Sequence, residues 1–346
     1  MASWRDILNR LVSGEDLETA DTRWIMDQIL TGEATAVPMA AFLAGLRVKG
    51  ETPAEVEGLV DAMLEHAVRI SIPVRSVDLV GTGGDGANTV NITTMASLVT
   101  AGAGLTVVKH GNRAASSTTG SSDVLSELGI NLNATPERVA ELATEVGITF
   151  CPAPVFHSSM KYVGPIRSEL GIATTFNILG PLTNPAQPEA SAIGASSRDL
   201  APVIAGVLAR KGRDGLVFRG GDGLDELAAT APSSVWEVRG GEIAEITLNA
   251  VTELGLPAIE TADLKGGDPQ YNASVVHRVM DGDKGAVRDT VLLNAAAGIV
   301  ADATLPGTAD GTFAERMLVG LEFATQSIDT GAAADVLSRW ATASNN

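Results

Sequence analysis

Cysteine is almost absent from this chain of 346 residues, which contains only Cys151. A single cysteine excludes an internal disulfide and favours a reducing compartment. The first residues, MASWRDILNRL, carry charges at once and lack the apolar segment of a secretory signal. We therefore expect a cytoplasmic protein.

Long apolar runs and basic residues are also scarce. The longest apolar stretches fall well short of the roughly 20 residues that a membrane-spanning helix needs, so no membrane contact is expected. Lysine and arginine number 24 against 42 aspartate and glutamate, and the net charge of −18 disfavours nucleic acid as a partner. An anionic substrate stays open, because a local basic pocket or a bound metal can override the overall field.

The chain has an apolar share of 45% and enough length for two domains with sizeable cores. Residues 1–73 show one helical pattern after another, including the capping box Thr52-Pro53-Ala54-Glu55. From Val77 onward, short apolar runs alternate with helical patterns, which is typical of a mostly parallel sheet. The runs lie at 77–81, 105–109, 148–151, 191–195 and 215–219, and a hairpin turned at Gly240-Gly241 follows at 236–248.

These patterns predict an α/β protein with a small N-terminal helical domain and a larger α/β domain around a mostly parallel central sheet. Residues 158–172 interrupt the alternation with an amphipathic helical pattern, so the segment 165–190 is expected to join the helical domain. The predicted division is 1–73 with 165–190 for the helical domain, and 74–164 with 191–346 for the α/β domain.

The glycines after the first predicted strand raise the question of which phosphate group they bind. Residues 81–86, GTGGDG, fit the G-x-G-x-x-G pattern of dinucleotide-binding loops, but this pattern alone is about as often only a tight turn. A dinucleotide fold also needs an acidic residue after the second strand, which binds the ribose hydroxyls. Here the second strand is predicted to end in Lys109, which suits a further phosphate group instead.

Two loops, one after the first predicted strand and one after the second, each lead into a helix. Hydroxyl and amide side chains stand at the starts of both helices. Asn91-Ile92-Thr93-Thr94 enters one helix, and the stretch Ser117–Ser121 enters the next. Either loop alone is equally well explained as a capped helix start, but two such loops with Lys109 between them favour a polyphosphate ligand. The adjacent acids Asp225 and Glu226 suggest Mg²⁺ beside that ligand, and taken alone they fit a solvated acidic turn better.

A series of motifs makes the chain resemble the anthranilate phosphoribosyltransferases over about residues 5–340. The motifs are GTGGDGANTVNITT, VVKHGNRAASS, GSSDVLSELG, HSSMKYVGPIRSELG, FNILGPLTNP and GLDEL, in this order and at these spacings. The resemblance implies transfer of the phosphoribosyl group of phosphoribosyl pyrophosphate (PRPP) to the amine of anthranilate, a step of tryptophan biosynthesis, with Mg²⁺. It also implies a homodimer that forms through the helical domain.

The resemblance implies roles for individual residues as well. Those it assigns to PRPP are Gly81, Gly84, Asp85, Thr89, Asn91, Ile92, Thr93, Thr94, Lys109, His110, Gly111, Asn112, Arg113, Ala114, Ala115, Ser116, Ser117 and Ser121. Those it assigns to anthranilate are Gly81, Asn112, His157 and Arg167, and those it assigns to the metal are Thr93, Asp225 and Glu226. Arg167, Lys109 and Asn112 are expected to be catalytic. His157 fits a buried core histidine equally well.

The sequence departs from the family pattern in places. Ala173 stands where an arginine is common, and Arg219 stands where a histidine is usual. Two other functions are considered: a pyrimidine nucleoside phosphorylase-like enzyme and a non-catalytic nucleic-acid-binding relative. The first carries a different glycine loop, which this chain lacks, and the second requires a basic groove, which the net charge of −18 disfavours.

Overall fold

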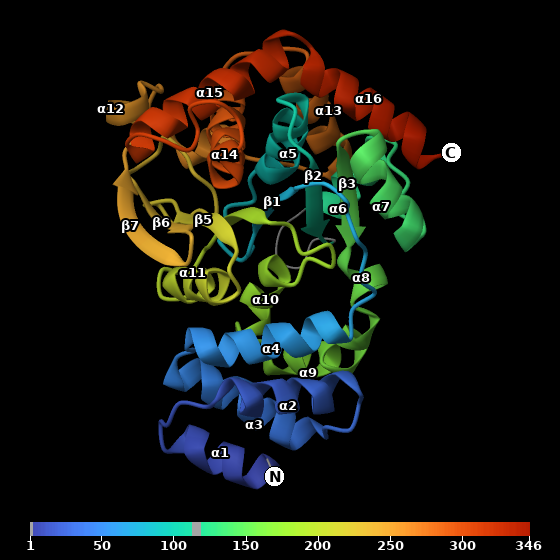
Figure 1. Ribbon diagram of the computed structural model, residues 1–346, viewed down its shortest axis with the longest axis vertical. Helices are drawn as coiled ribbons and strands as arrows, with labels where there is room; N and C mark the ends of the chain where they lie inside the picture. The colour runs from blue at the N-terminus through green and yellow to red at the C-terminus, as the bar shows by residue number, and fades with distance from the viewer. Residues whose placement is uncertain (1–2, 113–118) are drawn as a thin grey trace.

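The computed structural model describes residues 3–112 and 119–346, with a helical part at one end and a sheet-containing part at the other (Figure 1). The helical part contains α1 (Trp4–Val12), α2 (Thr19–Leu30), α3 (Ala36–Lys49) and α4 (Pro53–Glu65). α4 begins where the capping box predicts it, because Thr52 Oγ1 accepts from the Glu55 N–H and Glu55 Oε2 accepts from the Thr52 N–H. Residues 3–76 form no strand, as the sequence predicts.

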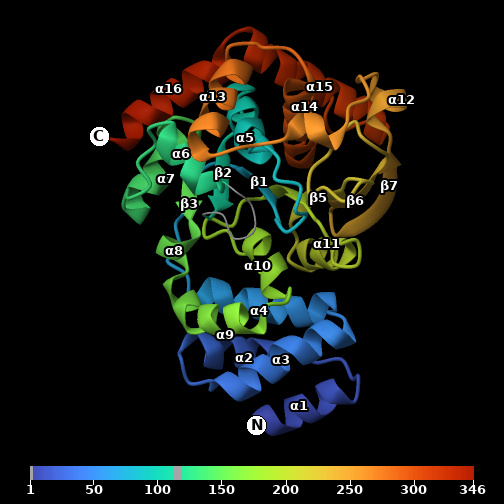
Figure 2. The same cartoon turned by 180° about the vertical axis from the view of Figure 1, so that it is seen from behind.

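Seven strands of the described residues form one sheet in the other part (Figure 2). They are β1 (Val77–Gly81), β2 (Val107–Gly111), β3 (Ile148–Pro152), β4 (Ala190–Gly194), β5 (Asp214–Arg219), β6 (Ser233–Arg239) and β7 (Glu242–Leu248). Their order is β3-β2-β1-β4-β5-β6-β7, in which β1 to β5 are parallel and the pairs β5–β6 and β6–β7 are antiparallel. The mostly parallel sheet is confirmed, and the hairpin turns at Gly240 and Gly241, both with positive φ.

The second strand begins and ends later than predicted. β2 begins at Val107 because the chain leaves α5 (Ile92–Gly102) through a turn at Gly104, whose φ is 100°. The strand then continues to Gly111, so Lys109 pairs with Phe150 of β3 inside the sheet and does not end the strand. The prediction that β2 ends in Lys109 is therefore wrong, and the lysine is buried.

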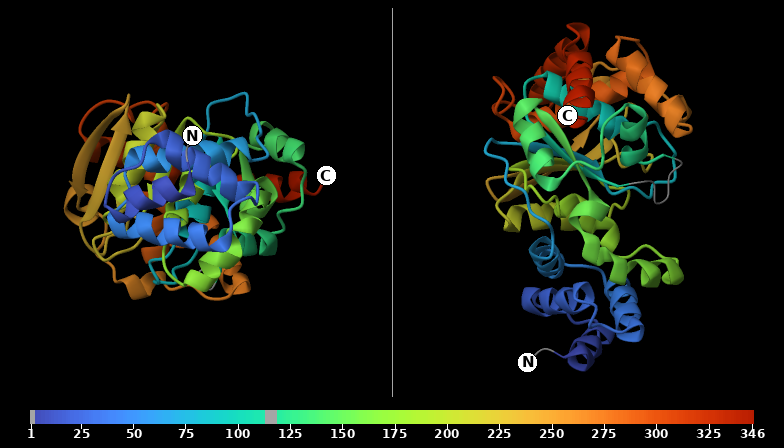
Figure 3. Two further views of the ribbon diagram at one scale, coloured as in Figure 1. Left: turned by 90° about the horizontal axis from the view of Figure 1, so that it is seen from below. Right: turned by 90° about the vertical axis from the view of Figure 1, so that its right-hand side faces the viewer.

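Helices cover both faces of the sheet, as the side view in Figure 3 shows. Besides α5, the helices that follow α4 in the described residues are α6 (Ser121–Glu127), α7 (Pro136–Glu145), α8 (Ala153–Phe156), η1 (Ser158–Tyr162), α9 (Gly164–Leu170), α10 (Phe176–Leu182), α11 (Ala201–Arg210), α12 (Ala250–Leu254), η2 (Thr261–Leu264), α13 (Pro269–Met280), α14 (Ala286–Asp302), α15 (Phe313–Asp329) and α16 (Ala332–Ser344). Within the described ranges, none of these helices combines the length and the hydropathy that a bilayer span requires.

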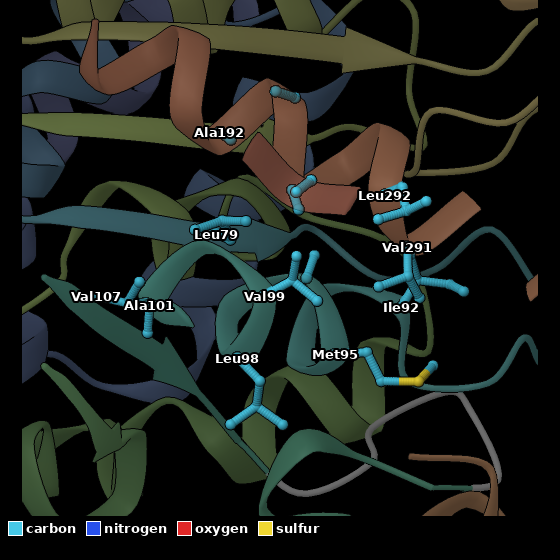
Figure 4. Close-up of a cluster of buried hydrophobic side chains, with 14 of the residues drawn as sticks. Leu79, Ile92, Met95, Leu98, Val99, Ala101, Val107, Ala192, Val291 and Leu292 are labelled. Carbon is cyan, nitrogen blue, oxygen red and sulfur yellow. The ribbon is translucent and has the colours of Figure 1, made fainter. Parts of the chain in front are cut away.

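Neighbouring residues of a strand point to opposite faces and so belong to different cores. Leu79 of β1 lies in a cluster with Val99 of α5 and Val291 of α14 (Figure 4). Val80, the next residue, lies in a second cluster with side chains of α11 and the N-terminal helices. The sheet is therefore covered by α5 and α14 on one face and by α11 on the other.

The segment that interrupts the alternation packs against the N-terminal helices. α9 contacts α3, η1 contacts α2, and α10 contacts both α4 and α11. Val163, Phe176 and Leu179 share a core cluster with side chains of α1 to α4. These contacts agree with the expected place of 165–190, while the domain boundaries themselves stay a prediction.

Candidate active site

The carboxyl ends of β1, β4 and β5 meet at one edge of the sheet, and the acidic turn (residues 220–226) folds back over them. Gly81 of β1 pairs with Gly194 of β4. The turn passes so close that a Cβ on Gly194 would lie 1.6 Å from the Asp225 carbonyl oxygen. A Cβ on Gly81 would lie 2.3 Å from Asp225 Oδ2. Both glycines therefore permit the close approach of the turn.

Two predicted metal ligands are fixed against the glycine loop (residues 82–91), which follows β1. The Gly83 N–H donates to Asp225 Oδ2 at 2.7 Å, and Thr89 Oγ1 donates to Glu226 Oε2 at 3.2 Å. Asp225 and Glu226 are buried, with 8% and 7% of their surfaces exposed. A solvated acidic turn would leave both acids in water, so the structure contradicts that interpretation.

The acid pair and Asp85 repel one another in a dehydrated site. Burial raises the pKa of Asp225 to about 7, and the Asp85 carboxylate adds to the rise. Burial also raises the pKa of Glu226 well above its ordinary value, with further contributions from Asp225 and Asp85. A cation placed among these carboxylates would relieve the repulsion and restore their ionised forms.

The donor set fits Mg²⁺. Asp225 and Glu226 offer carboxylate oxygens and Thr89 a hydroxyl, and oxygen is the ligand atom that Mg²⁺ prefers. The described residues contain no group of three His, Cys, Asp or Glu side chains placed to hold a metal. A bound Mg²⁺ would therefore complete its shell with phosphate and water, as it commonly does. Thr93 lies in the first turn of α5, and its metal role stays a prediction.

Lys109 lies inside the sheet, and its charge interacts with that of Glu226. Its Nζ donates to the Leu79 carbonyl of β1 at 2.5 Å. Burial lowers the pKa of Lys109 to about 8, although the nearby carboxylates of Asp78 and Glu226 oppose this shift. The lysine thus brings a positive charge close to Glu226, while a direct contact with PRPP stays a prediction.

The second predicted phosphate loop leads from β2 to α6. Asn91 connects the glycine loop to the end of this second loop by hydrogen bonds. Its Nδ2 donates to the Thr119 carbonyl oxygen at 3.1 Å, and its Oδ1 accepts from Asn272 Nδ2 at 2.8 Å. Ser121, at the start of α6, donates to the Asn112 carbonyl oxygen at 3.2 Å. The two loops are therefore joined at one edge of the sheet, which a single polyphosphate ligand requires. Arg113, Ala114, Ala115, Ser116 and Ser117, also assigned to PRPP, lie outside the described residues.

Several residues assigned to PRPP have buried side chains. Ile92 and Thr94 are 0% and 2% exposed, and Ile92 belongs to the core beneath α5. His110 is also buried, and its Nδ1 lies 2.9 Å from the Gly180 carbonyl oxygen. We expect these residues to act through their backbone or by supporting the loops. The assigned residues that keep exposed surface are Gly81, Gly84, Asp85, Thr89, Asn91, Thr93, Gly111, Asn112 and Ser121.

The two side chains assigned to anthranilate outside the loops come from different elements. Arg167 lies on α9, with its guanidinium 5.3 Å from the centre of the Phe176 ring, and burial lowers its pKa. His157 is buried, and its Nε2 lies 2.9 Å from the Thr183 carbonyl oxygen. These are the contacts of a satisfied core histidine. A contact with anthranilate stays a prediction for both residues.

Arg219, a departure from the family pattern, links the acidic turn to the glycine loop. Its Nε donates to the Ser196 carbonyl oxygen at 3.0 Å, and its Nη1 donates to the Gly220 carbonyl oxygen at 3.2 Å. Ser196 Oγ in turn donates to the Gly83 carbonyl oxygen at 2.8 Å. Sequence reasoning missed Ser196, because a serine in a loop belongs to no recognisable pattern. Nothing in the structure explains Ala173.

A cleft of about 260 Å³ lies apart from this edge, between η2, α13 and the start of α14. Lys265, Arg278, Lys284 and Arg288 line it together with Asp263 and Asp283, so basic side chains outnumber acidic ones in its lining. Of its lining residues, Val90 belongs to the glycine loop. None of the residues assigned to PRPP lines the cleft, which is therefore separate from the predicted phosphate site.

Two family models match the chain in the order of its two parts. Residues 5–67 match the glycosyl transferase family, helical bundle domain. Residues 74–334 match the glycosyl transferase family, a/b domain. The match thus covers both the helical part and the part that carries the loops.

Relatives that match almost the full length of the chain are named anthranilate phosphoribosyltransferase. The anthranilate phosphoribosyltransferases of Streptomyces griseus and Arthrobacter sp. are each 54% identical, over 99% and 98% of this chain and 96% and 95% of theirs. The solved enzyme of Thermus thermophilus has a TM-score of 0.90 at 38% identity, covering 99% of this chain and 100% of that chain. The Saccharomyces cerevisiae enzyme in complex with PRPP and Mg has a TM-score of 0.88 at 27% identity, covering 99% and 98%. With both parts matched and identity above half, this chain belongs to the anthranilate phosphoribosyltransferase family.

Proposed function

We propose that this chain transfers the phosphoribosyl group of PRPP to the amine of anthranilate, giving N-(5-phosphoribosyl)anthranilate and pyrophosphate. Its relatives support this reaction, since the yeast enzyme is described in complexes with PRPP and Mg and with 4-fluoroanthranilate. The observation that carries the proposal for this chain is the buried pair Asp225 and Glu226. The Gly83 N–H and the Thr89 hydroxyl hold that pair against the glycine loop.

The residues at this edge are suited to a pyrophosphate leaving group. Asp225 and Glu226, with Thr93 as the sequence predicts, would hold Mg²⁺. When bound, Mg²⁺ neutralises part of the charge that develops on pyrophosphate. The chain itself supplies the N–H groups of the glycine loop and of the first turn of α5, which favour anions. Lys109 adds a buried positive charge close to Glu226.

The reaction places little demand on a protein base. Loss of pyrophosphate builds positive charge on the ribose, so the weakly nucleophilic amine of anthranilate needs little activation. Catalysis then rests on positioning and on stabilising the leaving group. Arg167 would bind the anthranilate carboxylate with two parallel donors. Burial lowers the pKa of His110 to about 3 and also lowers that of His157, so both imidazoles are neutral at neutral pH and we assign neither a proton-transfer role.

We also propose a cytoplasmic homodimer that forms through the helical part. Val37 and Val48 of α3 are 80% and 88% exposed, and Val12 of α1 is 80% exposed. Val37 and Val48 are about three helical turns apart and so lie on one side of α3. Exposed aliphatic side chains on one side of a helix suit a contact with a second chain.

The intrinsic fluorescence of anthranilate tests the proposed reaction. With PRPP and Mg²⁺ present, we expect this fluorescence to fall while pyrophosphate appears in equal amount. A nucleoside phosphorylase would instead release a free base from a pyrimidine nucleoside and phosphate, a function that the comparisons do not favour. If anthranilate is not consumed at any concentration of PRPP and Mg²⁺, the proposal is wrong.

A further inference from the structure

In the described residues, the backbone ladder between β1 and β2 is limited to the start of the two strands. β1 pairs with β4 from Val77 to Gly81, but in the described residues its register with β2 is limited to Val77 and Val107. The glycine loop leaves the end of β1, and the second predicted phosphate loop leaves the end of β2. Whatever holds these two strand ends apart therefore sets the spacing of the two loops.

Two side chains occupy the groups of β2 that a continued ladder would pair with β1. In a regular parallel pair, the Val108 carbonyl and the His110 N–H would both bond to the β1 backbone. Here Asn184 Nδ2 donates to the Val108 carbonyl oxygen at 2.8 Å, and Asp78 Oδ1 accepts from the His110 N–H at 3.2 Å. Asn184 Nδ2 also donates to Asp78 Oδ2 at 2.9 Å, which joins the two side chains.

Lys109 completes the bridge between the strands. Its Nζ donates to the Leu79 carbonyl oxygen, the β1 group that would otherwise accept from β2. Asp78, Asn184 and Lys109 are 0%, 4% and 2% exposed, so water does not compete for these bonds. Asn184 is itself fixed, because its Oδ1 accepts from the Ala186 N–H at 3.0 Å.

We propose that Asp78 and Asn184 are positioning residues, which hold the ends of β1 and β2 apart and so set the distance between the two phosphate loops. The inference rests on the proposed function, because it assigns that spacing to PRPP. Asp78 has two oxygens for two donors, the His110 N–H and the Asn184 amide, whereas an asparagine would have one. Asn184 must donate to two acceptors at once, which an ionised aspartate cannot do.

Single substitutions at the two positions test the proposal. In Asp78→Asn, the new N–H₂ group would face one of the two donors, the His110 N–H or the Asn184 amide, and one hydrogen bond would be lost. We therefore expect kcat/KM for PRPP to fall about ten- to hundred-fold. Asn184→Asp removes both donated bonds and sets a second carboxylate beside Asp78, so we expect a similar loss at about pH 8. Thr149→Val is the matched control. Thr149 is buried on neighbouring β3 with no hydrogen-bond partner for Oγ1 among the described residues, so activity should stay within about twofold.

The pH profile of Asn184→Asp distinguishes positioning from a general loss of stability. Lowering the pH from about 8 to about 6 should raise its kcat/KM relative to the wild type by about tenfold, because a proton shared by two adjacent carboxylates restores one donor. Lys109, His110 and Cys151 also face Asp78. All three are present in the wild type as well, so comparing the two proteins over the same pH range removes their contribution. A protein that is merely less stable would show no such recovery.

The outcomes separate this inference from the proposed function. A wild type that does not transfer the phosphoribosyl group contradicts the proposed function. An active wild type, with both variants within about threefold of it, overturns only the positioning role. If Asp78→Asn does not fold, Asn184→Asp decides alone: recovery toward acid pH supports the proposal, and a profile parallel to the wild type overturns it.

Discussion

Two buried imidazoles, His110 and His157, lie beside the predicted site, and burial keeps them neutral. The His110 ring lies 5.2 Å from that of His157, and its Nδ1 contacts the Gly180 carbonyl oxygen. Its Nε2 is buried and has no hydrogen-bond partner within the part of the chain that the structure describes. Burial is the main reason that the pKa of His110 falls to about 3, and the charges that His157 and Lys109 carry when protonated lower it further.

This neutral histidine should make the fold sensitive to acid. Its pKa is about 6.5 in the unfolded chain and about 3 in the folded protein, so between these values only the unfolded chain takes up the proton. The contribution of His110 to stability is therefore lost as the pH falls below about 6.5, and this contribution is about 2 kcal/mol at about pH 5. The raised pKa values of Asp78 and Asp225 change stability in the opposite direction, so urea unfolding at about pH 7.5 and about pH 5 must compare the wild type with a variant in which residue 110 does not titrate.

His110→Asn is the matching variant for this test. Asparagine keeps an N–H for the Gly180 carbonyl oxygen and does not titrate. Its stability should therefore fall less than that of the wild type between the two pH values, by about 2 kcal/mol. Equal losses in the two proteins would show that His110 is not held neutral.

Arg167→Ala should raise the anthranilate KM about ten- to hundred-fold and leave the PRPP KM nearly unchanged. The Phe176 ring shields one side of the guanidinium from water, which strengthens its bond to a carboxylate. Initial rates with each substrate varied in turn measure both constants. Arg339→Ala, at an exposed arginine of α16 paired with Asp335, is the control and should change neither KM. A comparable rise of both KM values in Arg167→Ala would assign the arginine a structural role.

Among the elements, β1 to β5 are predictable because each is a short apolar run, and β6 and β7 are predictable from the hairpin turn at Gly240 and Gly241. The end of β2 is the exception. The charge of Lys109 suggests a strand end, but Asp78 and Glu226 compensate that charge inside the protein. Such compensation comes from segments far apart in the chain, and no local pattern contains it.

The element α10 and the bridge between β1 and β2 were not predictable. α10 contains Gly180 and Pro181, both unfavourable in helices, and the burial of Phe176 and Leu179 against the N-terminal helices stabilises it. Asp78 is a lone charge in the apolar run VDLVG, which is a weak signal of a buried polar contact. Its partner Asn184 lies 106 residues away, so only the fold shows that they meet.

The approach of the acidic turn to β4 predicts that Gly194 is indispensable. In Gly194→Ala the Cβ would overlap the Asp225 carbonyl oxygen at 1.6 Å, so the turn must move. We expect a loss of at least about 1–3 kcal/mol in stability, and a fall in activity of at least about tenfold because the acid pair moves too. Thermal unfolding and the transfer assay measure the two effects.

Gly180→Ala is the matched control for Gly194→Ala. A Cβ on Gly180 would meet no atom within 4 Å, and its φ lies outside the positive range. Alanine is the better helix former, so stability should hold or rise slightly. If the two variants behave alike, the close contact between Gly194 and Asp225 does not form in solution.

The whole molecule carries a net charge of −18, although both proposed substrates are also negatively charged. Their attraction must come from local groups, because charges beyond about 10 Å are largely screened at physiological salt. Arg167 belongs to the segment packed on the N-terminal helices, whereas the phosphate loops belong to the sheet-containing part. If each binds its predicted substrate, the two substrates meet between the two parts of the molecule.

The exposed valines of α3 predict the assembly state. We expect sedimentation equilibrium to give twice the chain mass of 35.5 kDa. Val37→Lys with Val48→Lys should shift the mass to that of one chain, because it places two charges on the proposed contact. Val251→Lys, at an exposed valine of α12, is the control and should keep the larger mass. A wild type that sediments as one chain at every concentration contradicts the proposed dimer.

Asp225 and Glu226 are proposed to act with Mg²⁺ on the leaving pyrophosphate, and the Mg²⁺ dependence of the transfer rate measures this role. The double change Asp225→Asn with Glu226→Gln keeps side-chain volume and removes both charges, so the fold should survive. Glu242→Gln with Glu245→Gln, at exposed acids of β7, is the matched control. We predict that the double variant at Asp225 and Glu226 loses at least about a hundred-fold in rate, and that the loss deepens as Mg²⁺ is lowered. A rate near that of the wild type, with an unchanged Mg²⁺ dependence, would contradict the account.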